Sequence, residues 1–170
     1  MTPKPLAAAL ALLALPTGTL AQGKQPCLTR AETTAAMRFA LPTVVSALDK
    51  QCSAALPASA YLIRNRQALA ARYAAEATRA GPEGRAAVLK IIDVPALGSV
   101  DDSTLRDLVG AGVGSAVGSI KPADCRKADD VLAAVDPLPA ANMATLIALV
   151  LEFSDRGDKG GAPFRICPSA

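Results

Sequence analysis

Apolar residues recur at helical spacing along most of this 170-residue chain, and that periodicity limits the fold more than any other feature. It is clearest over residues 101–120, where apolar side chains follow an i, i+3, i+4, i+7 pattern for four turns. Weaker stripes cover 44–52, 58–80, 82–92 and 125–135. Residues 140–153 are apolar nearly all round, which is typical of a buried helix. The sequence therefore predicts an all-α bundle.

Capping and helix-breaking residues divide these stripes into six or seven helices. Thr29 and Glu32 have the spacing of a capping box, and Pro42 is expected to end that first helix near residue 41. Gly81-Pro82 should separate a third helix from a fourth, and Asp101-Asp102 should cap the fifth. Because no long linker interrupts the pattern, we expect one helical domain over residues 22–170, with an extended tail at 155–170.

The first 21 residues have the pattern of a secretory signal peptide. Lys4 precedes a ten-residue run of only leucine and alanine, and Thr19-Leu20-Ala21 places small residues where the peptidase cleaves. The run is too short to span a bilayer. We expect cleavage before Gln22 and a soluble mature protein, periplasmic or secreted, without a transmembrane segment.

Four cysteines remain after this cleavage: Cys27, Cys52, Cys125 and Cys167. An even number in an oxidising compartment indicates two disulfides. If consecutive helices form antiparallel hairpins, the start of one helix lies beside the end of the next. This geometry predicts the pairs Cys27–Cys52 and Cys125–Cys167.

Several classes of function are disfavoured by what the chain lacks. It has no histidine, no serine-nucleophile motif and no tryptophan to line a carbohydrate cleft. We therefore expect no catalytic residues, no bound metal and no cofactor. The net charge of +3 is too small to predict nucleic-acid binding. It is uneven, however: residues 22–90 carry ten basic and four acidic side chains, against seven and eleven in residues 91–170.

Three glycines, Gly110, Gly114 and Gly118, are spaced four residues apart on the fifth helix, opposite its apolar stripe. A glycine row facing water would destabilise the helix by about 1 kcal/mol per residue relative to alanine. We therefore expect the row to lie against another backbone. That backbone is either a neighbouring helix of the same domain or a helix of a second subunit or membrane partner.

Arg64 and Arg72 lie eight residues apart and share a face of the third helix. Such arginine rows are commonly solvated faces with buried aliphatic stems. The alternative is that these two side chains face an anionic partner, such as a lipid headgroup or an acidic protein.

Several short segments resemble uncharacterised exported, disulfide-containing helical proteins of alphaproteobacteria. They are Cys27-Leu28-Thr29-Arg30-Ala31-Glu32, Phe39-Ala40-Leu41-Pro42, Lys121-Pro122-Ala123-Asp124-Cys125, Pro137-Leu138-Pro139 with Asn142, and Ile166-Cys167-Pro168. The resemblance covers most of the mature chain and implies export and disulfides. It implies no activity, and it carries no functional site to this chain.

Taken together, these features favour an exported, non-enzymatic helical protein that binds another macromolecule or serves as a structural component of the envelope. The alternative is a carrier of a small amphiphile, held in an apolar cavity between helices. We expect such a cavity to be lined by residues such as Leu105, Val109, Ile147 and Leu151.

Overall fold

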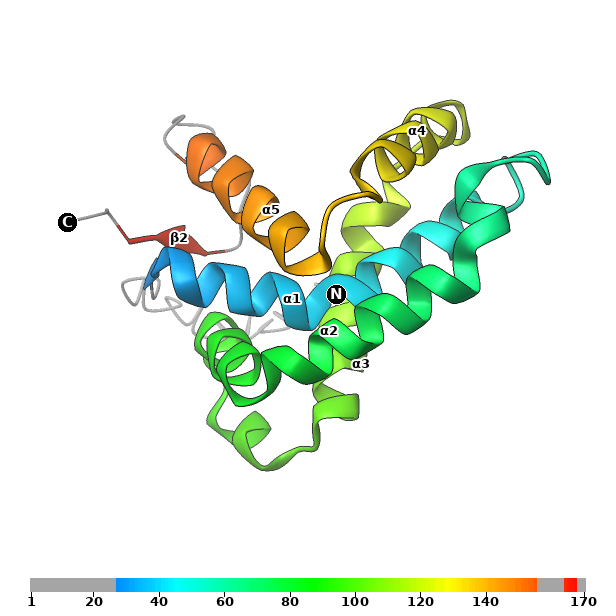
Figure 1. Ribbon diagram of the computed structural model, residues 1–170. Coiled ribbons are helices and arrows are strands. Elements are labelled where there is room, and N and C mark those ends of the chain that lie inside the picture. Colours follow the sequence, from blue (N-terminus) through cyan, green and yellow to red (C-terminus); the bar gives the residue numbers. More distant parts are fainter. Residues whose placement is uncertain (1–26, 156–163, 168–170) are drawn as a thin grey trace, which may run out of the picture.

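The computed structural model describes residues 27–155 and 164–167 (Figure 1). These residues form five α-helices: α1 (Arg30–Cys52), α2 (Tyr61–Ile92), α3 (Asp102–Gly118), α4 (Cys125–Val135) and α5 (Ala140–Asp155). Short 3₁₀ helices, η1 (Pro95–Ser99) and η2 (Pro122–Asp124), precede α3 and α4, and β1 (Cys27–Leu28) pairs with β2 (Arg165–Ile166). The helical class is confirmed, but the expected six or seven helices are five. The expected signal peptide and most of the expected tail lie outside the described residues.

α1 begins as predicted but does not end at Pro42. The Thr29 hydroxyl accepts a hydrogen bond from the Glu32 amide (3.2 Å), and the Glu32 carboxylate accepts one from the Thr29 amide (2.7 Å). The helix then continues through Pro42 to Cys52. A proline inside a helix costs about 3 kcal/mol. Here the turns on both sides of it are held by buried side chains, Phe39 and Val45 among them, and this packing outweighs the cost.

The predicted separation at Gly81-Pro82 is a kink within α2. Gly81 has φ +42°, a left-handed conformation that glycine adopts without strain. Past the kink, Gly84 lies directly against α1. A Cβ atom on Gly84 would be 2.8 Å from the Phe39 Cβ and 2.9 Å from the Ala35 carbonyl oxygen. The kink therefore lets the second half of α2 approach the backbone of α1.

Two aspartates cap helices, one on its own helix and one across the fold. Asp101 accepts hydrogen bonds from the amides of Ser103 (2.9 Å) and Thr104 (3.0 Å), as expected for the cap of α3. Asp129, on α4, accepts hydrogen bonds from the first two amides of α2, those of Tyr61 (2.9 Å) and Leu62 (2.6 Å). Its buried carboxylate therefore joins α4 to the start of α2.

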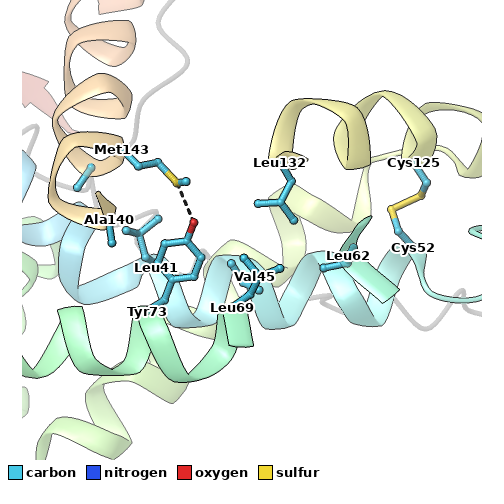
Figure 2. Close-up of a cluster of buried hydrophobic side chains, with 11 residues drawn as sticks. Leu41, Val45, Cys52, Leu62, Leu69, Tyr73, Cys125, Leu132, Ala140 and Met143 are labelled. Atoms are coloured by element: carbon cyan, nitrogen blue, oxygen red, sulfur yellow. Dashed lines mark hydrogen bonds between the residues drawn. A yellow bond between two sulfur atoms is a disulfide. The ribbon is translucent and has the colours of Figure 1, made fainter. Parts of the chain in front are cut away.

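The core has two clusters, one on each side of the central α1–α2 pair. In the first, α1 and α2 meet α4 and α5, and the Tyr73 hydroxyl donates a hydrogen bond to the Met143 sulfur (3.3 Å), as Figure 2 shows. The second joins α1 and the second half of α2 to α3, around Phe39 and Leu105. Small side chains fill much of both clusters, which agrees with the aromatic-poor composition.

Both predicted disulfide pairings are wrong. The bonds are Cys27–Cys167 and Cys52–Cys125. The prediction required a hairpin turn at Pro42, whereas α1 is one helix of 23 residues and therefore about 35 Å long. Cys27 and Cys52 consequently lie at its opposite ends, far beyond the separation of about 7 Å that a disulfide spans. Cys27 instead reaches Cys167, whose amide donates to the Leu28 carbonyl oxygen (2.8 Å) beside the parallel β1–β2 pair.

The prediction that the last helix is the buried centre of the bundle is also wrong. α5 lies across α1 at one side of the molecule (Figure 1) and buries mainly the small side chains Ala144 and Ala148, with Met143. Phe153 is 71% exposed and Val150 is 55% exposed. The apolar composition of α5 therefore does not mean that the whole helix is buried. Among the described residues, no helix is both long and apolar enough to cross a membrane.

Candidate binding groove

An open groove of about 620 Å³ runs between α1 and α3. The two helices also contact each other along it. A Cβ atom on Gly110 would contact the Thr43 side chain (3.6 Å), and the Gln51 amide donates hydrogen bonds to the carbonyl oxygens of Ile120 (2.9 Å) and Gly118 (3.4 Å). Small and hydroxyl-bearing side chains dominate the walls. The lining residues are Pro42, Thr43, Ser46, Ala47, Lys50, Gln51, Ser103, Arg106, Asp107, Gly110, Ala111, Gly114 and Gly118.

The whole glycine row predicted from the sequence lines this groove. Its expected contact with another backbone is absent within the described residues. Gly110 meets only a side chain within 4 Å, and a Cβ atom on Gly114 or Gly118 would meet no heavy atom within that distance. Of the glycines in the described part of the chain, Gly84 is the one where an added Cβ atom would meet a neighbouring backbone. The contact with a second molecule, the other interpretation of the row, stays a prediction.

Three charged residues line the groove: Lys50, Arg106 and Asp107. The guanidinium carbon of Arg106 lies 5.1 Å from the centre of the Phe39 ring. The Arg106 Nε is buried and has no hydrogen-bond partner in the part of the chain that the structure describes. The exposed Lys50 likewise forms no ion pair with any described residue. The groove therefore carries a net positive charge.

The two arginines predicted to share an anion-facing surface differ in their surroundings. Arg72 forms an ion pair with the Asp136 carboxylate and donates a hydrogen bond to the Asp136 carbonyl oxygen (3.0 Å). Its charge is therefore neutralised within the fold. Burial and a hydrogen bond to Asp136 raise the pKa of the neighbouring Tyr61 to about 12. Arg64 is exposed on α2, with no ion pair among the described residues. Only Arg64 of this pair is thus left facing outward.

The residues expected to line an amphiphile cavity are divided between the two core clusters. Leu105 and Val109 pack in the α1–α2–α3 cluster, and Ile147 packs against the other. Leu151 is half-buried on α5. The structure therefore does not gather these side chains around one cavity. Within residues 27–155 and 164–167, no three Cys, Asp or Glu side chains lie close enough together to bind a metal ion.

Sequence reasoning missed the α1 wall of the groove and the position of Arg106 in it. A local pattern in the sequence does indicate this wall. Small or polar residues recur on one side of a helix at Thr43, Ser46, Ala47 and Lys50. That signal is visible only if α1 continues through Pro42. The exposure of Arg106 to the groove depends on how α1 and α3 meet, which no local pattern contains.

Comparison with protein-family models, curated proteins and solved structures gave no match to this chain. A function can therefore be proposed only from its own residues and geometry.

Proposed function

We propose that this chain is an exported, non-enzymatic helical protein that binds another macromolecule through the α1–α3 groove, in the periplasm or outside the cell. The absence of histidine and of nucleophile motifs from the sequence supports a binding role, and the two disulfides suit an oxidising compartment. A structural role in the envelope would use the same surface.

The observation that carries this proposal is the space in front of Gly114 and Gly118. Gly114 lies inside α3 and costs the helix about 1 kcal/mol relative to alanine, whereas Gly118 is its last residue. Nothing among the described residues would collide with a Cβ atom at either position. A partner whose backbone approaches α3 closely would account for both glycines, since a side chain there would hold it away.

Site-specific photo-crosslinking in the exporting cell tests the proposal. A benzoylphenylalanine is placed at Ala111, an exposed residue on the rim of the groove, and in a matched control at Gln67, exposed on α2. We expect a discrete crosslinked species from position 111 and none from position 67. Equal crosslinking from both positions, or none from position 111, would contradict the proposal. A purified native protein that carries a small molecule would favour the amphiphile carrier instead.

A further inference from the structure

We infer that the partner enters the groove as an extended, acidic peptide segment, with one carboxylate paired to Arg106 and a second to Lys50. This inference deepens the proposed function and rests on it. Its first support is the charge of the lining residues, which include two cations and one carboxylate, that of Asp107. A net positive groove favours anionic partners by charge complementarity.

The second support comes from comparing Arg106 with the other half-buried arginines of the described residues. These are Arg38, Arg72 and Arg85, and each forms an ion pair with a carboxylate of this chain. Arg106 lines the groove and has no such partner among the described residues. A carboxylate from outside the chain would supply one through a charge-assisted hydrogen bond.

The length of the groove selects a peptide over a single small anion. Arg106 lies over Phe39 on α1, and Lys50 is eleven residues further along the same helix. At 1.5 Å per residue, Phe39 and Lys50 are about 16 Å apart along the axis of α1. A single small anion does not cover that length of helix. An extended chain covers the distance in about five residues at roughly 3.3 Å each.

The glycines of the groove favour an extended segment over a helix, because the side chains around a helix hold its axis about 5 Å from any surface that it packs against. The glycines at 114 and 118 let the backbone of an extended segment lie close to α3. The occupant is thus a short peptide segment with two carboxylates about five residues apart.

The test is an NMR titration of the mature, disulfide-bonded protein. The probe is a capped six-residue peptide with glutamate at both ends and alanine and serine between them, and its control has glutamine at both ends. We expect saturable shifts of the Arg106 Nε–Hε and Gly114 amide signals with the glutamate peptide alone. We further expect the dissociation constant of the glutamate peptide to rise at least tenfold in R106Q and in K50Q. It should not change in R64Q, the matched exposed control. R106K retains the charge and should recover part of the affinity. This variant separates loss of charge from loss of packing on Phe39.

Three results would overturn this inference. Equal shifts with the glutamine peptide would show that charge does not select the partner, whereas crosslinking from Ala111 would still support the groove as a binding site. Inorganic phosphate that shifts the same signals with equal affinity would assign the site to free anions. The absence of shifts with either peptide would exclude the acidic segment. Failure of the Ala111 crosslinking itself is a separate result, and it would remove the proposed function.

Discussion

Helix-interior glycines meet two different surroundings in this protein, and substitutions at Gly84 and Gly114 should have opposite effects. Gly84→Ala places a methyl group 2.8 Å from the Phe39 Cβ, so we expect it to lower the free energy of unfolding by about 1–3 kcal/mol. Gly114→Ala meets nothing within 4 Å and should raise that free energy by up to about 1 kcal/mol. Urea unfolding midpoints measure both. A loss of stability in Gly114→Ala would show that the groove is filled within the chain itself.

A second residue, Asp129, acts on a helix to which it does not belong. Its carboxylate accepts the hydrogen bonds of the Tyr61 and Leu62 amides, which have no partner within their own helix. We expect Asp129→Ala to lower the free energy of unfolding by about 1–2 kcal/mol, as the loss of a helix cap does. Asp130→Ala is the control, because Asp130 is the exposed neighbour on α4. Equal losses from the two variants would contradict the capping role.

At the scale of elements, the continuity of α1 determines both the groove and the disulfides. α1 passes Pro42 without a turn, so residues 43–51 extend along α3 and form one wall of the groove. The same continuous helix separates Cys27 from Cys52 and leaves each to pair with a distant cysteine. The interpretation of Pro42 as a helix end therefore caused three errors: an extra helix, the wrong disulfide pairs and the missing groove wall.

The packing of α1 on α2 includes a buried carboxylate, and it should make stability depend on pH. Burial acts to raise the pKa of Glu76, but hydrogen bonds from Arg79 (2.7 Å) and Arg38 (2.5 Å) outweigh it and lower the pKa below 4.5. The ion pairs therefore contribute full stability above the unfolded pKa near 4.5. This stability is lost as the pH falls through the lower folded value.

We expect urea midpoints to fall as the pH drops below about 4.5, and to fall less in Glu76→Gln, which is already less stable at pH 7. Glu83→Gln serves as the control, since Glu83 is an exposed carboxylate on the same helix. An equal pH dependence in the wild type and Glu76→Gln would show that this cluster does not contribute to the acid sensitivity.

At the scale of the whole molecule, the two disulfides hold different parts of the fold and differ in exposure. Cys52 and Cys125 are fully buried in the first core cluster, whereas Cys27 and Cys167 are half-buried beside the β1–β2 pair. Reduction requires access of a thiolate to the sulfur. We therefore expect a mild reductant to open Cys27–Cys167 first, as mass spectrometry of alkylated peptides would show. Earlier labelling of Cys52 and Cys125 would contradict this order.

The parts of the fold that the sequence predicts correctly are those set by neighbouring residues. The capping box at Thr29, the Asp101 cap and the helical class all follow from local spacing. The exposure of Phe153 and the cap that Asp129 provides depend on which helices meet. The glycine row was found from its spacing, but the groove in front of it needs α1, about sixty residues earlier in the chain.

The central claim is that the α1–α3 groove is open because a partner fills it. Gly114→Leu, combined with the crosslinker at position 111, tests this claim most directly. The account predicts a folded variant with a urea midpoint at or above that of the wild type, because leucine favours a helix and meets no atom within 4 Å at its Cβ. It also predicts that the crosslinked species is lost. A stable variant that still crosslinks at the wild-type yield would contradict the claim.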